Sequence, residues 1–222
     1  TLVNQVYQQE LAQKNAEIEA LQAQINPHFL YNTLDSVNWM LIARGEMDIS
    51  AVVVALGKLM QYSMDTARAM VSLEEEYRNV RDYLMIQKNR LEDRLEFTLE
   101  LDEPLKCFPV PKLILQPLVE NAIKYGIEPS LQPGHILVRT RKTDDDIQIL
   151  VKDNGCGMDE AQLTFYRRLL RNDLSGQTNI GVRNVARRLQ LHFGGRCGFN
   201  VSSRPGDGLS ITIRIPAQEE QS

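Results

Sequence analysis

The stretch Asn26-Pro27-His28-Phe29-Leu30-Tyr31-Asn32-Thr33-Leu34 decides how the rest of the sequence is interpreted, because it places a proline directly before a histidine inside a helical pattern. Proline in a helix interior removes one backbone hydrogen bond and clashes with the preceding turn, at a cost of about 3 kcal/mol. A cost of this size needs compensation, and the simplest candidate is the placement of His28. The stretch therefore predicts a functional histidine.

The residues before this stretch carry a short heptad pattern, with Leu11, Ile18 and Ile25 seven residues apart and Leu21 on the same seam. Such a seam is typical of a coiled coil, although a lysine interrupts it. A solvated amphipathic helix explains the pattern as well. We favour a parallel dimer stem that enters from an upstream domain.

The residues after the stretch continue the helical period to about Ala43, and a turn over residues 45–48 ends in Asp48 as the expected N-cap. A second helix follows to Met64, and the capping box of residues 72–75 opens a third. Two helices joined by a short turn form an antiparallel hairpin, and two such hairpins form a four-helix bundle.

From Leu95 the apolar period changes from helical to alternating. Pro109 and Pro111 are expected to start a helix that ends at Gly126, and another helix is expected over residues 180–192. Strands are expected at residues 95–101, 136–140, 147–151, 199–202 and 209–215. The sequence thus predicts an α+β protein with a helical domain over residues 1–95 and a mixed sheet with helices on one face over residues 96–217.

Composition excludes several classes of protein. The net charge of −4 argues against a nucleic-acid partner. Cys107, Cys156 and Cys197 have no metal-ligand spacing and favour a reducing compartment. No apolar run approaches the roughly 18 residues that span a bilayer, and no signal peptide is present. Because the chain opens within a helical pattern and without methionine, we expect a fragment that lacks its upstream part.

Four patches in the second half combine polar residues and glycines. In the first, Asn121, Lys124 and Tyr125 lie three and four residues apart and so share one helix face. An amide oxygen for a metal, an ammonium group for phosphate and a ring for stacking suit a nucleotide. Polar residues at helical spacing more often simply face water.

The second patch, Asp153-Asn154-Gly155-Cys156-Gly157-Met158, follows a strand directly. A fixed carboxylate can accept a hydrogen bond from the exocyclic amine of adenine, and Gly155 and Gly157 let the backbone approach a ligand. The third patch, residues 175–181, opens a helix whose N-terminus attracts phosphate. The fourth, Gly206-Asp207-Gly208, is explained equally well as a hairpin turn.

The order of these patches resembles the N box and the three G boxes of the Bergerat ATP-binding fold, which histidine kinases share with gyrase, Hsp90 and MutL. Together with residues 26–32, the chain resembles the LytS/YesM type of bacterial sensor histidine kinase. The resemblance implies a homodimer that phosphorylates its own histidine with Mg-ATP and passes the phosphoryl group to an aspartate of a response-regulator receiver domain. It also implies the cytoplasmic part of a protein of the inner or plasma membrane.

The resemblance assigns a role to each motif residue. His28 is the expected phosphate acceptor and Asn121 the Mg²⁺ ligand. The other nucleotide contacts are expected from Lys124 for phosphate, Tyr125 for stacking, Asp153 for adenine, and Gly155, Gly157 and Gly181 for the shape of pocket and lid. The segment 159–179, with Arg167, Arg168 and Arg171, is expected to close as a lid, although an ordinary amphipathic helix explains it too.

The sequence departs from the family pattern at several places. Pro117 stands where gyrase-like ATPases carry the glutamate that activates water, which favours phosphoryl transfer over hydrolysis. Asn179 replaces a common glycine, and Phe29 replaces the acidic residue that often follows the acceptor histidine. Asn32, one turn later, is the candidate to orient the His28 ring. Two alternatives stay open, a Bergerat-type ATPase or clamp and a catalytically silent nucleotide-binding scaffold.

Overall fold

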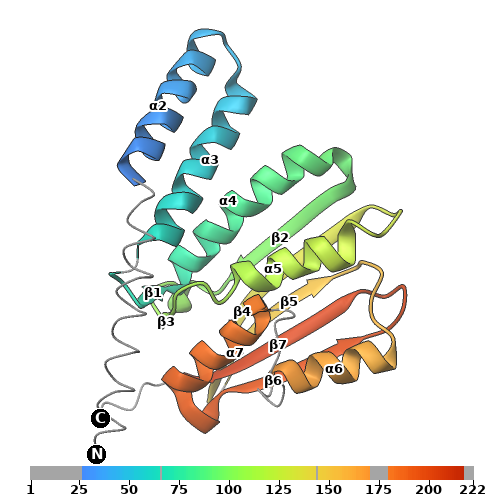
Figure 1. Cartoon of the computed structure of the whole chain (residues 1–222). Coiled ribbons are helices and arrows are strands. Elements are labelled where there is room, and N and C mark those ends of the chain that lie inside the picture. The colour runs from blue at the N-terminus through green and yellow to red at the C-terminus, as the bar shows by residue number, and fades with distance from the viewer. Residues whose placement is uncertain (1–26, 66, 144, 171–179, 218–222) are drawn as a thin grey trace, which may run out of the picture. The chain divides into compact units, whose positions relative to one another are not determined.

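The computed structural model describes residues 27–65, 67–143, 145–170 and 180–217. It contains two compact units that divide between Gly57 and Lys58, and Figure 1 shows their helices and strands. The predicted stem over residues 1–25, most of the third glycine-containing patch and Arg171 lie outside the described residues.

The predicted hairpin is formed by α2 (Pro27–Ala43) and α3 (Met47–Met64), and the first unit contains α2 and the part of α3 up to Gly57. The turn between them uses Gly45 at a φ of +76°, a left-handed conformation that glycine adopts without steric cost. The Ser50 hydroxyl donates a 2.6 Å hydrogen bond to Oδ1 of Asn38 and so joins the two helices.

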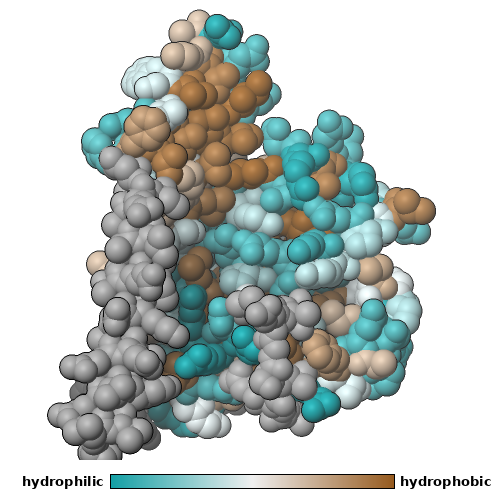
Figure 2. Space-filling view, viewed as in Figure 1, coloured by the Kyte–Doolittle hydropathy of each residue, from teal (hydrophilic) through white to brown (hydrophobic). Residues whose placement is uncertain are grey.

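The hairpin leaves many apolar side chains exposed in the single chain. Figure 2 shows hydrophobic surface gathered over α2 and α3. The side chains that are at least half exposed are Phe29, Trp39, Met40, Met47 and Ile49. Exposure on this scale marks an interaction surface in a globular protein. Among the described residues, no helix combines the length and the apolar character needed to cross a membrane.

The second unit is built on a five-stranded sheet in the order β2-β4-β5-β7-β6. The strands are β2 (Leu95–Leu101), β4 (Gly134–Lys142), β5 (Asp146–Asp153), β6 (Gly198–Ser203) and β7 (Leu209–Pro216). The β2–β4 pair is parallel, and the other three pairs are antiparallel. The sheet is therefore mixed, as predicted from the sequence.

Helices cover one face of this sheet, and Figure 1 shows them as one layer. The layer consists of α4 (Leu73–Leu91), α5 (Gln116–Asn121), α6 (Glu160–Leu170) and α7 (Ile180–Phe193). Burial along β4, β5 and β7 alternates, so that one face is fully buried and the other is partly exposed. Single-turn 3₁₀ helices follow α4, β2 and α7 at Glu92–Arg94, Glu103–Leu105 and Gly194–Arg196.

The compact units do not divide where the sequence changes period. Helix α4 lies before the predicted boundary at residue 95, but it belongs to the second unit. Its residues Leu73, Tyr77, Val80 and Leu84 are part of the core that the sheet and α5 also form. Packing of this apolar face against the sheet therefore places the compact division within α3 and not after α4.

Three local expectations are corrected by the structure. Asp48 is not the N-cap of α3, because the helix begins at Met47 and includes Asp48 in its first turn. Pro109 and Pro111 do not start a helix but form β3 (Pro109–Pro111), which pairs with β1 (Met70–Ser72). The helix after them begins only at Gln116 and ends in a π-helical turn, Ala122–Ile127, so Gly126 is not its C-terminal stop.

We expect Ser72→Ala to lower the free energy of unfolding by about 1 kcal/mol, because the side chain of Ser72 caps α4. Its hydroxyl accepts a hydrogen bond from the backbone of Glu75, and the Glu75 carboxylate accepts one from the Ser72 backbone in return. Urea denaturation of the full chain measures the change. Ser202→Ala, at an exposed position of β6, is the control and should leave the midpoint unchanged.

Candidate nucleotide-binding site

Asp153, the last residue of β5, is the most deeply buried carboxylate of the predicted site, with 2% of its surface exposed. Its Oδ1 accepts hydrogen bonds from the backbone N–H groups of Gly155 (2.8 Å) and Leu209 (3.3 Å). Within the described chain, Oδ2 accepts none. Burial raises the pKa of Asp153, and the two backbone donors act in the opposite direction. The open oxygen can accept a hydrogen bond from an amine.

Glycines without side chains allow backbone segments to pack closely around Asp153. A Cβ atom on Gly126 would lie 2.7 Å from Oδ1 of Asp153, and one on Gly155 would lie 2.3 Å from the backbone of Gly126. A Cβ atom on Gly157, which has a φ of +67°, would lie 1.9 Å from the carbonyl oxygen of Arg204. These glycines therefore make room for other parts of the chain. The prediction was that Gly155 and Gly157 make room for a ligand.

The turn at Gly206 and Gly208 belongs to the same cluster. A Cβ atom on Gly208 would lie 2.1 Å from the carbonyl oxygen of Asp153. The Ser203 hydroxyl donates a hydrogen bond to the Gly208 carbonyl and accepts one from the backbone of Met158. The fourth patch is thus a hairpin turn that also supports the loop after Asp153.

The helix α5 and its π-helical extension bring Asn121 and Tyr125 to one cavity of about 560 Å³. Lys124 is exposed and does not line this cavity, and its Nζ lies 5.1 Å from the centre of the Tyr125 ring. Of the three residues predicted to share a face, Asn121 and Tyr125 line the cavity and Lys124 does not. A π-helical turn at this position is a feature often found at functional sites.

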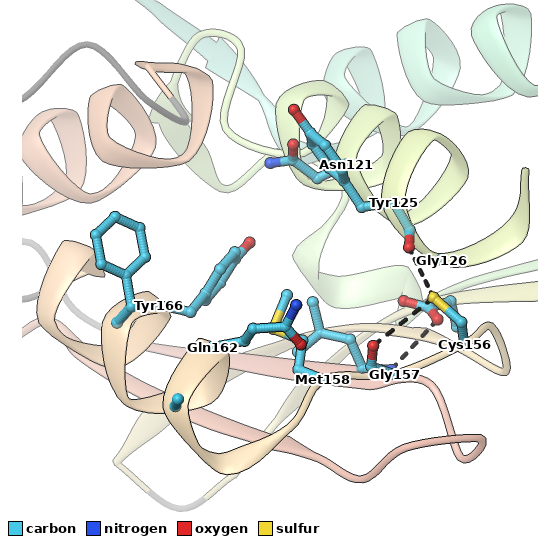
Figure 3. A pocket seen from close by; sticks show the side chains of 12 residues that line it. Asn121, Tyr125, Gly126, Cys156, Gly157, Met158, Gln162 and Tyr166 are labelled. Carbon is cyan, nitrogen blue, oxygen red and sulfur yellow. Dashed lines mark hydrogen bonds between the residues drawn. The ribbon is translucent and has the colours of Figure 1, made fainter. Parts of the chain in front are cut away.

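Figure 3 shows the cavity from close by, with Asn121 and Tyr125 on one side and Tyr166 and Gln162 on the other. The lining residues shared with the prediction are Asn121, Tyr125, Asp153 and Gly157. The rest of the lining is mainly apolar and includes Met158, Phe165, Tyr166 and Leu209. A largely apolar cavity with a few fixed polar groups is typical of a small-molecule site.

Tyr166 of α6 is a cavity residue that sequence analysis missed. It is 3% exposed, and its hydroxyl makes no hydrogen bond of normal geometry within the described chain. Burial raises the pKa of Tyr166, the charge of Asp153 acts in the same direction, and the amide of Asn121 opposes them. Its helical spacing from Leu163 and Leu170 indicated a buried position, but not a polar group facing a cavity.

The first part of the predicted lid is an amphipathic helix packed on the core. Helix α6 buries Leu163, Tyr166, Leu169 and Leu170. The guanidinium of Arg167 donates hydrogen bonds to the carbonyl oxygen of Val201 on β6, at 3.1 and 3.3 Å. Arg167 therefore contacts the sheet and does not line the cavity.

Gly181, a predicted site residue, and Glu120, the neighbour of Asn121 in sequence, lie outside the cavity lining. A Cβ atom on Gly181, at the start of α7, would meet Cβ of Pro117 at 3.3 Å, so this glycine allows close packing of α7 on α5. Glu120 is exposed and accepts a 2.7 Å hydrogen bond from the amide of Gln116. The structure thus gives both residues contacts within the helix layer.

The predicted acceptor His28 lies on α2 in the first unit and is exposed. Nδ1 of His28 lies 3.2 Å from Nδ2 of Asn32, one turn further along the helix. An amide can present either its oxygen or its nitrogen to a ring nitrogen, so this contact can hold either neutral tautomer of the imidazole. The pairing of these two residues was predicted.

Comparison with known families identifies both parts of the chain. The model of the histidine kinase family matches residues 16–95. The model described as histidine kinase-, DNA gyrase B- and HSP90-like ATPase matches residues 110–219. The two matches place the chain in the histidine kinase family, with an ATPase-type domain as its second part.

The relatives narrow the class further. The chain is 41% identical to the sensor histidine kinase YesM of Bacillus subtilis over 219 residues, which are 99% of this chain and 36% of YesM. It is 27% identical to the sensor protein kinase HptS of Staphylococcus aureus over 97% of this chain and 41% of HptS. The chain thus spans less than half the length of these relatives. It belongs to the LytS/YesM-type histidine kinases.

A solved structure supports the fold. The histidine kinase domain of the blue-light activated kinase EL346 from Erythrobacter litoralis matches with a TM-score of 0.50 and 18% identity. The match covers 85% of this chain and 95% of that domain. At this identity the likeness concerns the fold, which is the predicted combination of a helical region and a mixed sheet with helices.

We expect Asp153→Asn to raise the free energy of unfolding of the unliganded chain near pH 7. Burial raises the pKa of Asp153 in the folded chain, so the wild type loses stability as the pH rises from the ordinary aspartate value, about 3.9, through the raised value. Asparagine keeps the acceptor oxygen and has no such loss. Urea denaturation at a series of pH values in that range measures the difference.

The difference between Asp153→Asn and wild type should shrink as the pH falls toward the ordinary aspartate value, because both side chains are then uncharged. Asp145→Asn, the same substitution at an exposed position, is the matched control. Parallel pH profiles for wild type and Asp153→Asn would contradict the assignment of an uncompensated buried charge.

Proposed function

We propose that this chain is the kinase part of a sensor protein that phosphorylates His28 with Mg-ATP and passes the phosphoryl group to an aspartate of a response-regulator receiver domain. The observation that carries the proposal is the buried carboxylate of Asp153, with one open oxygen, at a cavity formed within the segment that the ATPase family model matches. A base with an exocyclic amine fits this carboxylate, and a phosphate group does not.

The cavity residues suit an adenine nucleotide. Tyr125, Phe165 and Met158 provide apolar and aromatic surface for a purine, and Asp153 provides the acceptor. Asn121 brings an amide oxygen, a donor type that Mg²⁺ accepts. Lys124, one turn from Asn121 and exposed, can reach the more polar end of such a ligand. When bound, Mg²⁺ would supply neutralisation of phosphate charge.

The proposed reaction at His28 follows from its contact with Asn32. The structure places the amide nitrogen of Asn32 at Nδ1, and amide oxygen and nitrogen are interchangeable assignments; with the oxygen at Nδ1, that ring nitrogen holds the proton and Nε2 carries the nucleophilic lone pair. Nε2 then forms a bond to the γ-phosphorus, the bond from phosphorus to the bridging oxygen breaks, and ADP leaves with the electron pair. This transfer requires chiefly in-line placement and charge neutralisation.

The proposal includes a homodimer in which two α2–α3 hairpins form the four-helix bundle. The exposed apolar side chains of the hairpin, among them Trp39 and Met40, supply the surface that a second copy would cover. We also place this region on the cytoplasmic side of a longer, membrane-anchored sensor, since the relatives named as sensors are longer than this chain. A receiver domain is the proposed partner for the phosphoryl group.

We expect wild-type chain incubated with γ-labelled ATP and Mg²⁺ to acquire label that is stable to alkali and lost in acid, as a phosphorus–nitrogen bond requires. His28→Gln should abolish the label, and Asn121→Ala should reduce its rate of formation by about 10²-fold or more. His135→Gln is the matched control, because His135 is exposed and bonds Thr98 at the sheet edge. It should keep the label.

Other outcomes separate the alternatives. Label that survives in His28→Gln would move the acceptor elsewhere and refute the central assignment. Release of phosphate without label on the protein would favour a Bergerat-type ATPase or clamp. ATP binding without either label or hydrolysis would favour the silent scaffold.

We expect Asn32→Ala to slow label formation by about fivefold, the effect of losing one hydrogen bond of about 1 kcal/mol. The amide of Asn32 contacts Nδ1 of His28 and orients the ring, whereas the cavity residues stay intact. Initial rates of labelling at saturating ATP measure this effect. Ser36→Ala removes a hydroxyl that bonds the Asn32 carbonyl and serves as control on the same helix, with an unchanged rate expected.

A further inference from the structure

Glu76 of α4 is a carboxylate with no exposed surface that binds backbone groups before α5. It accepts hydrogen bonds from the N–H groups of Leu113 (2.6 Å), Ile114 (2.9 Å) and Leu115 (2.8 Å). A fourth hydrogen bond, at 2.5 Å, comes from the hydroxyl of Tyr62 at the end of α3. All four donors approach the two oxygens of one side chain.

The N–H groups that Glu76 binds directly precede α5. This helix runs only from Gln116 to Asn121, and its own N-cap residue, Leu115, provides no side-chain hydrogen bond. Leu113 has a φ of +60°, a left-handed conformation that costs a non-glycine residue about 1 kcal/mol or more. The carboxylate from α4 therefore binds three successive backbone donors just before α5 and holds this backbone in a conformation that its sequence does not favour.

The same segment is held from two other helices. Lys112, which is 7% exposed, places its Nζ 4.7 Å from the centre of the Tyr62 ring and donates a hydrogen bond to the carbonyl oxygen of Asp65. Arg188 of α7 donates to the carbonyl oxygen of Lys112 at 2.7 Å and to that of Leu113 at 3.4 Å. The start of α5 is thus attached to α3, α4 and α7.

The other end of the same helical segment is attached to a different partner. The backbone N–H of Cys156 donates a 3.0 Å hydrogen bond to the carbonyl oxygen of Gly126, next to Asp153. The segment from Gln116 to Ile127 is therefore anchored to the Asp153 loop at its end and to Glu76 at its start. Asn121 lies between the two anchors.

We propose that Glu76, supported by Tyr62, is a positioning residue that sets the orientation of Asn121 toward the metal-bearing part of the nucleotide. This inference rests on the proposed function, in which Asn121 is the Mg²⁺ ligand. Because the Asp153 loop has its own anchor, loosening of the Glu76 anchor moves Asn121 and leaves adenine recognition in place. The effect of Glu76 is thus specific to the contribution of Mg²⁺ to nucleotide affinity.

The test is calorimetric titration of the full chain with ADP, once with excess Mg²⁺ and once with EDTA. The quantity measured is the factor by which Mg²⁺ tightens ADP binding. In Asn121→Ala, Mg²⁺ should no longer tighten ADP binding. Tyr62→Phe should reduce the factor by about fivefold, the equivalent of one hydrogen bond, and Glu76→Gln should reduce it further. Both variants should keep the affinity for ADP in EDTA.

Tyr77→Phe is the matched control. Tyr77 is a buried tyrosine of α4, and its hydroxyl bonds the side chain of Thr140 and the carbonyl oxygen of Glu100, away from α5. Its loss should cost stability without changing the Mg²⁺ factor. Tyr62→Phe leaves the bonds from Glu76 to the backbone intact, so it tests the inference even where Glu76→Gln does not fold.

Each outcome separates this inference from the proposed function. Full Mg²⁺ enhancement in both Tyr62→Phe and Glu76→Gln would overturn the positioning role and leave the proposed site intact. An equal loss of affinity with and without Mg²⁺ would also overturn it, because it indicates a general loss of structure. A wild type whose ADP affinity does not respond to Mg²⁺ would instead overturn the proposed metal site, and the inference with it.

Discussion

The hydrogen bonds between Glu76 and the backbone of residues 113–115 are the interaction on which the helix layer of the second unit depends. A carboxylate buried without a cation costs several kcal/mol unless hydrogen-bond donors replace the lost water. Glu76 has four such donors, three of them from a segment that lacks a cap of its own. The side chain and the segment therefore stabilise each other, and neither conformation is favourable alone.

Asp153 is also a buried carboxylate, but the described chain satisfies only part of its capacity to accept hydrogen bonds. Burial raises the pKa of both Glu76 and Asp153. Both oxygens of Glu76 accept hydrogen bonds from the chain, whereas within the described residues only Oδ1 of Asp153 does. The first group is therefore structural, and the second has capacity for a ligand. Burial and the direction of the pKa shift are alike for the two carboxylates, so only the hydrogen bonds that each one accepts distinguish them.

Local patterns were sufficient for most of the periodic elements and for contacts between residues of one helix. The hairpin, the capping box at Ser72 and the pairing of His28 with Asn32 depend on residues close in sequence. The sequence did not reveal Tyr166 as a cavity residue or Glu76 as the side chain that binds the backbone before α5, because their partners lie on other elements of the fold and not within one helix or loop. The β3 strand was missed because its prolines also suit a helix start, and only pairing with β1 decides between them.

The packing of α4 explains why a boundary drawn from sequence at residue 95 differs from the compact division at residues 57 and 58. The histidine kinase family model extends to residue 95 and so includes α4, although α4 packs in the core of the second unit. Helix α3 itself begins in the first unit and ends, with Tyr62, in the second. Within the second unit, the Tyr62 hydroxyl donates a hydrogen bond to the Glu76 carboxylate, so the end of α3 takes part in the interactions that set the start of α5.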